Sequence, residues 1–233
     1  MNVRTIPDDH VQVPRHGGGW ALLVEAALDL RMTGAIAPSG KALARAVTDR
    51  IWLAPRPLSV LEVGAGTGAI TQALIPRLPP DSRLDVVEAN PRLATLLWRL
   101  VNTCPDLAGS PTRVTVHQTF LEDFSTDERY DVIVSGLPLT NLAPSRVEQI
   151  MSRYMELLSP GGTLTLIGYL GSRRGRTRAG RRQRAAADDI LADYRRRYAT
   201  RRWTVWANLR SAHVWRLQRP FLPVAPSSDG GMR

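Results

Sequence analysis

The sequence of 233 residues contains one cysteine, Cys104, and only 6% aromatic residues. A single cysteine excludes a disulfide framework and a thiolate zinc cluster, so a reducing cytoplasmic setting is expected. The first residues contain acids and prolines but no apolar core segment, and they do not resemble a secretory signal. No stretch approaches the ~18 apolar residues of a membrane-spanning helix. We therefore expect a cytoplasmic protein, either soluble or peripheral at the inner face of the membrane.

Lysine is almost absent as well, since Lys41 is the only one, and the other basic residues are arginines. The chain has 31 basic against 21 acidic side chains and a formal net charge of +10. Fifteen arginines lie between Arg173 and Arg219, where only three aspartates oppose them. GC-rich coding could explain the arginine content, but the clustering predicts a polyanionic partner. That partner is either a nucleic acid or an anionic membrane leaflet.

The N-terminal part divides into two predicted segments. We expect residues 1–17 to be a disordered leader and residues 18–57 to form a helical appendage. Within it, Trp20–Met32 is apolar on nearly all sides except for three charged residues. This pattern suits either a helix packed over the core or an amphipathic helix that contacts a membrane interface. The interfacial alternative predicts salt-sensitive binding to anionic liposomes.

Residues 58–219 are predicted to form one α/β domain. Short apolar runs at 58–63, 84–88, 114–120, 131–137 and 163–170 predict strands, and 69–78, 91–102 and 145–158 predict helices. Repeated strand–helix units predict a mostly parallel sheet with helices on both faces and ligands beyond the carboxyl ends of the strands. An arginine-rich insertion over 172–184 then precedes a predicted helix at 185–198. Two late strands, 203–209 and 212–218, are expected to pair antiparallel, and residues 220–233 to form a disordered tail.

A glycine-rich turn follows the first predicted strand. Glu62-Val63-Gly64-Ala65-Gly66-Thr67-Gly68 leads directly into a helix, and glycines spaced in this way let a ligand approach the backbone closely. Glu88 ends the next strand, where a carboxylate can accept hydrogen bonds from two ribose hydroxyls. The acid before the glycines and the absence of a G-x-G-x-x-G spacing favour S-adenosylmethionine over NAD.

This arrangement resembles the class I S-adenosylmethionine-dependent methyltransferases, which implies a Rossmann-like, seven-stranded, mostly parallel sheet with an antiparallel last strand. The resemblance also implies an acid after the third strand that binds the adenine amino group. Glu122 and Asp123 stand there, and we expect Asp123 to take this role. The residues expected to bind the cofactor are Glu62, Gly64, Ala65, Gly66, Thr67, Gly68, Glu88, Ala89, Glu122, Asp123 and Ser135.

The segment after the fourth strand, Ser135-Gly136-Leu137-Pro138-Leu139, is where methyltransferases place the acceptor. Adenine-N6 methyltransferases carry Asn-x-Pro-aromatic here, because an amide orients the amine and an aromatic ring stacks the base. This chain has Ser135 and Leu139 instead, so a smaller or aliphatic acceptor is favoured. An rRNA adenine dimethyltransferase remains the alternative, because the arginine-rich segment suits RNA. A binding module without catalysis is the third hypothesis, and the retained Glu88 argues against it.

The string S-G-L-P-L resembles the bacterial phospholipid N-methyltransferases of the rRNA-dimethylase-like branch. The resemblance implies transfer of methyl groups to phosphatidylethanolamine towards phosphatidylcholine, with phospholipid and an anionic membrane surface as partners and neither a nucleic acid nor a protein partner. It implies Ser135 and Tyr169, at the ends of strands, as the catalytic candidates. Arg210-Ser211 stands where the family usually has two prolines, which leaves ornithine lipid or another amino lipid open as the acceptor.

The substrate site is expected to combine aliphatic and cationic groups. A guanidinium can grip a headgroup phosphate with two hydrogen bonds, and the late hairpin supplies two arginines for this role. The four histidines have no metal-ligand spacing, so no metal is expected. The predicted substrate-binding residues are Leu137, Pro138, Leu139, Arg210 and Arg216.

Overall fold

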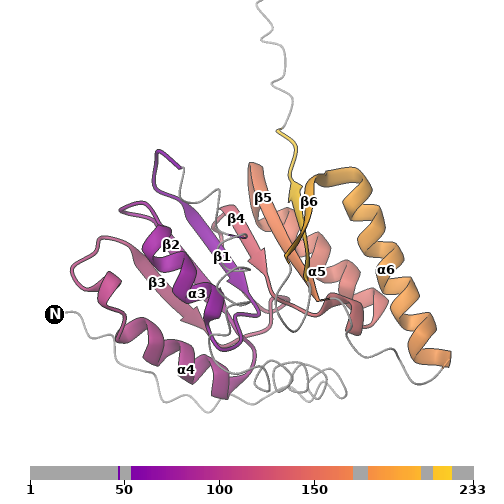
Figure 1. Ribbon diagram of the computed structural model, residues 1–233, viewed down its shortest axis with the longest axis horizontal. Helices are drawn as coiled ribbons and strands as arrows, with labels where there is room; N and C mark the ends of the chain where they lie inside the picture. The colour runs from indigo at the N-terminus through magenta and orange to yellow at the C-terminus, as the bar shows by residue number, and fades with distance from the viewer. Residues whose placement is uncertain (1–46, 48–53, 170–177, 206–211, 222–233) are drawn as a thin grey trace, which may run out of the picture.

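The computed structural model describes residue 47 and residues 54–169, 178–205 and 212–221. These residues form a seven-stranded sheet with the strand order β3-β2-β1-β4-β5-β7-β6 (Figure 1). Strand β7 runs antiparallel to both of its neighbours, and the other paired strands are parallel. The predicted α/β class, with a mostly parallel sheet and an antiparallel last strand, is therefore confirmed.

The strands match the apolar runs of the sequence to within a few residues, except at β5 and β6. They are β1 (Ser59–Val63), β2 (Arg83–Val87), β3 (Arg113–His117), β4 (Tyr130–Ser135), β5 (Leu158–Tyr169), β6 (Ala199–Val205) and β7 (Ala212–Gln218). Strand β5 begins earlier than predicted, directly after the preceding helix. Strand β6 also begins earlier than predicted, residues 206–209 of the predicted strand lie outside the described residues, and β6 pairs antiparallel with β7 as expected.

The helices connect the strands on both faces of the sheet. They are α3 (Ala69–Leu74), α4 (Pro91–Asn102), α5 (Pro144–Leu157) and α6 (Arg178–Tyr198), with the short 3₁₀ helices η1 (Ile75–Arg77), η2 (Pro105–Leu107) and η3 (Leu139–Asn141). The start of α4 shows how the sequence sets a boundary. Asn90 accepts hydrogen bonds from the backbone N–H groups of Arg92 and Leu93, and Pro91 occupies the first helical position.

Two apolar cores hold these helices on the sheet. On one face, α3 and α4 pack with Val60, Leu84 and Val86, which are almost completely buried. On the other face, α5 and α6 pack with strand residues that include Leu61 and Ile133. A further cluster joins Val47 to β4, β5, β6 and β7. Because β1 leads to β2 on one side and β4 lies on its other side, the sheet has its topological switch point between β1 and β4.

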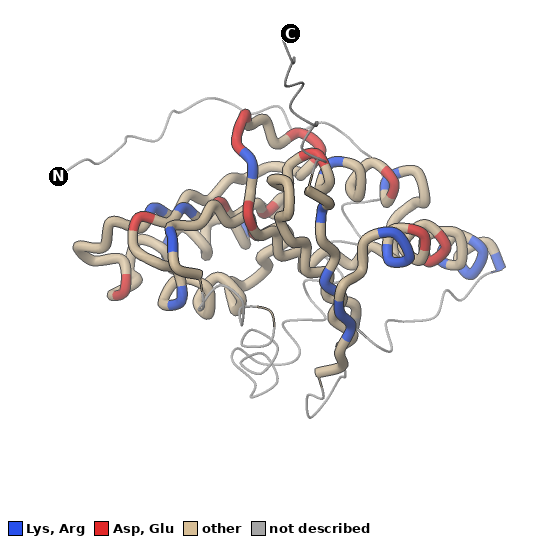
Figure 2. Tube along the Cα trace, turned by 90° about the horizontal axis from the view of Figure 1, so that it is seen from above, with Lys and Arg blue, Asp and Glu red and all other residues tan. Residues whose placement is uncertain are grey.

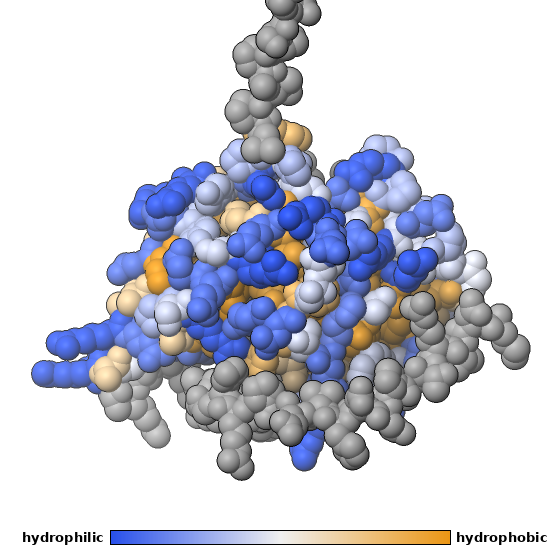
Figure 3. All heavy atoms as spheres, turned by 180° about the vertical axis from the view of Figure 1, so that it is seen from behind, coloured by the Kyte–Doolittle hydropathy of each residue, from blue (hydrophilic) through white to orange (hydrophobic). Residues whose placement is uncertain are grey.

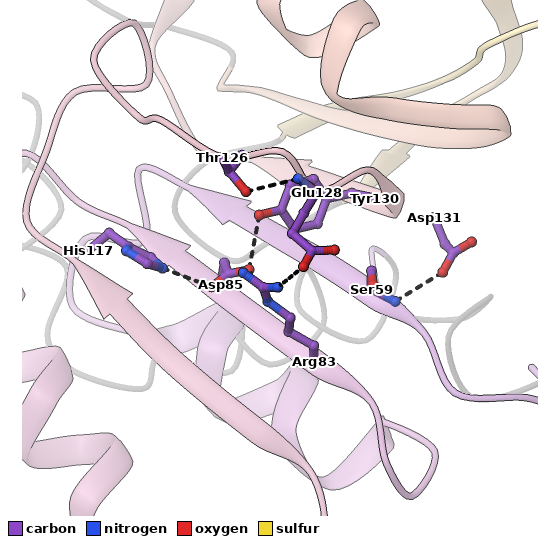
Figure 4. A network of polar contacts seen from close by, with 8 residues as sticks. All are labelled: Ser59, Arg83, Asp85, His117, Thr126, Glu128, Tyr130 and Asp131. Carbon is purple, nitrogen blue, oxygen red and sulfur yellow. Dashed lines mark hydrogen bonds and ion pairs between the residues drawn. The ribbon is translucent and has the colours of Figure 1, made fainter. Parts of the chain in front are cut away.

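A buried polar network ties β2 to β3 and to the start of β4 (Figure 4). Asp85 of β2 is fully buried and accepts hydrogen bonds from Arg83 Nε (2.7 Å) and Tyr130 Oη (2.9 Å), with His117 Nε2 at 2.8 Å. Burial alone would raise the pKa of Asp85, but these hydrogen bonds outweigh it and hold the pKa below its usual value. Arg83 also pairs with Glu128. The network fixes the segment before β4 to the sheet.

Helix α6 begins earlier than the sequence predicts. We expected residues 172–184 to form an insertion and the helix to start at residue 185, but the structure starts α6 at Arg178. The second half of the arginine-rich stretch is therefore helical. Figure 2 shows basic residues at both ends of α6 with acidic residues between them.

Several predictions fall outside the described residues: the leader 1–17, nearly all of the appendage 18–57 with Trp20–Met32, the first part of the arginine-rich stretch, and most of the tail 220–233. Among the helices that are described, none is long and apolar enough to cross a membrane.

Candidate active site

The glycine-rich turn and the loop after β4 meet at the carboxyl ends of β1 and β4. Gly64 N donates to Val87 O (2.8 Å), and Gly136 N donates to Val63 O (2.9 Å). A Cβ atom on Gly136 would stand 2.8 Å from the carbonyl oxygen of Gly64, and one on Gly64 would stand 2.7 Å from the Leu137 side chain. Gly64 also has a positive φ of 70°. Glycine at both positions lets the two loops touch, and together they form the floor of a cleft.

The cleft is partly open to solvent and encloses about 700 Å³ of empty space when the open part is included. Its walls come from the ends of β1 to β4 and from the first half of α5. The lining residues are Val63, Gly64, Gly66, Val87, Glu88, Ala89, Asn90, Leu93, Thr119, Phe120, Leu121, Glu122, Gly136, Leu137, Pro138, Leu142, Arg146 and Ile150.

Glu88 lies on the cleft wall as the sequence predicts. One carboxylate oxygen accepts from Gly66 N (2.9 Å) and the other accepts from Asn90 N (2.8 Å). Burial raises the pKa of Glu88, and these backbone donors oppose the rise. They hold the carboxylate at the end of β2, where its remaining lone pairs can accept from ribose hydroxyls.

Glu62 lies deeper than the cleft wall. Its side chain is buried, Thr71 Oγ1 donates to its Oε2 (2.7 Å), and its Oε1 has no hydrogen-bond partner within the described structure. Burial raises the pKa of Glu62 to about 7; the Thr71 hydrogen bond lowers it and the charge of Glu88 adds to the rise. Glu62 therefore joins β1 to α3 beneath the glycine turn.

The segment after β3 places Glu122, and not Asp123, on the cleft wall. Asp123 is exposed and does not line the cleft. Glu122 accepts a hydrogen bond from Arg146 Nε of α5 (2.6 Å), and the Arg146 guanidinium lies 5.0 Å from the centre of the Phe120 ring. The turn in which Asp123 N donates to Phe120 O decides which of the two acids faces the cleft. The structure thus favours Glu122 for the adenine contact.

Ser135 lies behind the cleft and does not line it. It is 1% exposed, and its Oγ accepts hydrogen bonds from Tyr154 Oη of α5 (2.8 Å) and Leu137 N (3.4 Å). Burial raises the pKa of Tyr154, so this hydroxyl stays protonated and donates. The position of Ser135 favours a role in shaping the loop after β4 over direct contact with the acceptor.

Only some of the predicted substrate residues line the cleft. Leu137 and Pro138 line the cleft, whereas Leu139 is 6% exposed and packs in the core, because η3 turns its side chain inward. Arg216 lies on β7 away from the cleft, is 4% exposed and stacks on Trp203 with its guanidinium 5.1 Å from the ring centre. Arg210 is outside the described residues. Tyr169 ends β5, and its side chain is also outside them.

The contribution of α5 to the cleft is not among the predictions from the sequence. Arg146 and Ile150 of α5 line the cleft together with Leu142, which precedes the helix, and the spacing of four residues between Arg146 and Ile150 places them on one side of the helix. A helix that directly follows the acceptor loop must begin at the carboxyl edge of the sheet, which is the signal that could have identified these residues. Within the described structure no group of three or more potential metal ligands occurs.

The residues present fit S-adenosylmethionine. Gly66 lines the cleft with open space where a Cβ atom would stand, so a ligand can lie against its backbone. Glu88 is placed for ribose hydroxyls, and Ala89, Phe120 and Leu121 provide an apolar wall beside Glu122 for an adenine ring. A cofactor with these parts would extend from the end of β2 and β3 to the loop after β4.

Comparisons with known proteins agree with this geometry. A family model described as "Methyltransferase domain" matches residues 61–164. The ornithine lipid N-methyltransferase of Singulisphaera acidiphila is 33% identical over 135 residues, which cover 57% of this chain and 68% of that protein.

Solved structures share the fold. The N-methyltransferase NodS from Bradyrhizobium japonicum WM9 in complex with S-adenosyl-L-homocysteine matches with a TM-score of 0.62 and 20% identity, over 86% of this chain and 98% of that chain. The 1,6-didemethyltoxoflavin-N1-methyltransferase from Burkholderia thailandensis matches with a TM-score of 0.58 and 18% identity, over 92% and 93%. This chain belongs to the class I methyltransferases, and its cofactor is S-adenosylmethionine.

Proposed function

We propose that this enzyme transfers methyl groups to the amine of a membrane lipid headgroup, with ornithine lipid favoured over phosphatidylethanolamine. The observation that carries the proposal is the aliphatic lining beyond the cofactor loop: Leu137, Pro138, Leu142 and Ile150. The similarity to an ornithine lipid N-methyltransferase supports the choice of acceptor. We further propose that the enzyme works at the cytoplasmic surface of the membrane.

Among the described residues, the lining after β4 offers no stacking platform for a nucleobase. The aromatic side chain in the cleft, Phe120, comes from the segment after β3, and the guanidinium of Arg146 lies over its ring. The amide side chain in the cleft, Asn90, caps α4 with its oxygen. An adenine acceptor would need an amide and a free ring beside the loop after β4. An amine on a lipid headgroup needs neither.

The apolar lining also suits the chemistry of an amine. When bound, S-adenosylmethionine supplies an activated methyl group on a sulfonium. A primary ammonium resembling lysine has a pKa of ~10.4, so the site must favour the neutral amine that carries the lone pair. Leu137, Pro138 and Leu142 exclude water, and low polarity lowers the pKa of a bound amine. The carboxylates that line the cleft, Glu88 and Glu122, are held by backbone donors and by Arg146.

The experiment that tests this function is a panel of acceptors. Purified enzyme with S-adenosylmethionine labelled in its methyl group would be incubated separately with ornithine lipid, phosphatidylethanolamine and structured RNA, each lipid dispersed in neutral detergent. We expect the label in ornithine lipid, with slower transfer to phosphatidylethanolamine. Label in RNA alone, or no transfer to either lipid, would refute the proposal. The Glu88→Gln variant serves as the control for cofactor-dependent transfer.

A further inference from the structure

Two tryptophans and four arginines form two stacks at the β6 edge of the sheet, one on each face: Trp215 packs on the face covered by α5 and α6, and Trp203 packs with Val214 on the other face. Trp215 of β7 has two guanidiniums over its ring, those of Arg195 (4.6 Å to the ring centre) and Arg202 (5.0 Å). Trp203 of β6 likewise has Arg201 (5.4 Å) and Arg216 (5.1 Å). We call these six residues the arginine–tryptophan cluster. Guanidiniums held on indole rings lose less conformational freedom when they bind an anion than free arginine side chains do.

The cluster carries a concentrated positive charge. Arg201 and Arg202 are exposed on the edge strand β6, and neither forms an ion pair with a carboxylate in the described structure. Arg195 is half-buried and its Nε has no hydrogen-bond partner among the described residues. Burial lowers the pKa of Arg195, Asp188 raises it, and the nearby charge of Arg202 lowers it further. Charges that repel one another in this way are stabilised by an anionic partner.

The strand register places this cluster level with the acceptor loop. Ser135 of β4 pairs with Leu166 of β5, Leu166 with Trp215 of β7, and Trp215 with Arg202 of β6. Three strand spacings separate β4 from β6, which corresponds to ~14 Å. The cluster thus lies beside the cleft and at the same height of the sheet, and not at the opposite end of the molecule.

The start of α6 adds a second group of basic residues, close to the cleft. Arg178, Arg181 and Arg182 are exposed there, and Arg184 Nη2 donates to Asn141 Oδ1 (2.6 Å) in the 3₁₀ turn after the acceptor loop. In Figure 3, hydrophilic side chains cover the edge of the molecule where α6 lies, on the left in that view. Cationic groups therefore lie at both ends of α6, one end near η3 and the other near β6, with Asp188, Asp189 and Asp193 between them.

We propose that this edge, formed by α6 and β6 with the arginine–tryptophan cluster, docks the enzyme on an anionic bilayer. Arginine attracts anionic headgroups, and tryptophan rings favour the interfacial zone of a bilayer. Docking at the height of the acceptor loop brings lipid headgroups to the mouth of the cleft. The inference rests on the proposed lipid acceptor, because an enzyme acting on a soluble amine would not need a surface there.

The test compares the full chain with two double variants of equal charge. Arg201→Gln with Arg202→Gln removes charge from the β6 edge. Arg99→Gln with Arg113→Gln is the matched control, because Arg99 on α4 and Arg113 on β3 are exposed near the opposite edge of the sheet. Binding would be measured by co-sedimentation with vesicles of phosphatidylcholine and phosphatidylglycerol in equal amounts, and with phosphatidylcholine vesicles alone.

We expect wild-type protein to bind the anionic vesicles and not the neutral ones. Since each arginine near the surface contributes about 1 kcal/mol, the β6 variant should bind about 30-fold more weakly, whereas the control should keep wild-type binding. Equal weakening in both variants would show a net-charge effect only and would overturn the proposal. So would unchanged binding of the β6 variant, which is the result expected if these arginines only prevent edge-to-edge strand pairing.

Two further measurements separate this proposal from the proposed function. Transfer to ornithine lipid in neutral detergent should be equal in wild type and the β6 variant. If wild type shows no transfer, the proposed function is refuted, and the vesicle-binding experiment alone tests the docking surface. Structured RNA should compete poorly with anionic vesicles. Tight RNA binding that depends on Arg201 and Arg202, without vesicle binding, would contradict a membrane partner.

Discussion

The backbones of Gly136 and Gly64 pass close to each other in the active site, and adding a single methyl group at Gly136 tests this contact. A Cβ atom on Gly136 meets the carbonyl oxygen of Gly64 at 2.8 Å, so the Gly136→Ala variant should lose ~1–3 kcal/mol of unfolding free energy. Gly168→Ala on β5 is the matched control, because its Cβ atom would have an ordinary contact of 3.8 Å. Urea unfolding measures both. Equal stability of the two variants would show that the loops can move apart freely.

The two neighbouring acids after β3 are expected to differ in their effect on cofactor binding. Glu122 lines the cleft and Asp123 does not, so Glu122→Gln should weaken binding of S-adenosylhomocysteine about tenfold, because a hydrogen bond to a charged group is lost. Asp123→Asn should leave binding unchanged. Isothermal titration calorimetry compares them directly. Weaker binding in the Asp123 variant alone would restore the assignment predicted from the sequence.

Glu62 predicts a pH dependence of stability. Its pKa is about 7 in the folded protein, above the usual value of a glutamate, so folding favours the protonated form. As the pH rises from ~4.5 to ~7, Glu62 ionises in the unfolded chain but stays largely protonated in the folded protein, so the folded state progressively loses stability, and the loss is complete above that range. In cofactor-free protein, Glu62→Gln should become more stable relative to wild type across this window. A difference in unfolding free energy that does not vary with pH would contradict the raised pKa.

Some individual residues could be placed from the sequence and others could not. The positions of Gly64, Gly66 and Glu88 follow from the link between a strand end and a tight turn, and the structure puts all three on the cleft wall. The directions of Leu139 and Arg216 depend on a 3₁₀ turn and on strand register, which local sequence does not encode. Their side chains consequently lie away from the cleft, in the core and against Trp203.

At the scale of elements, apolar runs predicted most of the sheet and α4 without error in its bounds. The predicted start of α6 is wrong, because the helix includes part of a stretch rich in arginine and glycine that predicts a loop. Arginine has a good helix propensity, and Arg184 donates to Asn141 of η3, which holds this part of the helix. A contact with a distant element, which local sequence does not show, thus accompanies the longer helix.

The contact between α5 and β4 carries a prediction about catalysis. Tyr154 donates to Ser135, so Tyr154→Phe should lower the unfolding free energy by ~1–2 kcal/mol, because the buried Ser135 hydroxyl loses this hydrogen bond.

Ser135→Ala should retain methyl transfer within a few-fold of wild type, since Ser135 does not line the cleft. Initial rates at saturating cofactor measure this. A loss of several hundredfold with intact folding would instead make Ser135 a catalytic residue.

At the scale of the whole molecule, a single sheet carries both the cleft and the arginine–tryptophan cluster. The parallel strands bring the glycine turn, Glu88 and the acceptor loop to one edge, and the antiparallel pair β7–β6 places Trp215 and Arg202 at the same height. Neither the pairing register nor the stacking of arginine on tryptophan could be predicted from composition, although the cluster of arginines was evident. This arrangement supports an enzyme that takes its acceptor from a charged surface.

The central claim is that the aliphatic cleft receives a lipid amine, and one competition experiment tests it most directly. Enzyme and S-adenosylmethionine with a deuterated methyl group would be incubated in one vessel with a bacterial lipid extract that contains ornithine lipid and with total RNA. Mass spectrometry would then locate the label. We predict deuterated methyl groups on the amine of ornithine lipid and none on adenine. Deuterated N6-methyladenine in the RNA, with unlabelled lipid, would contradict the account.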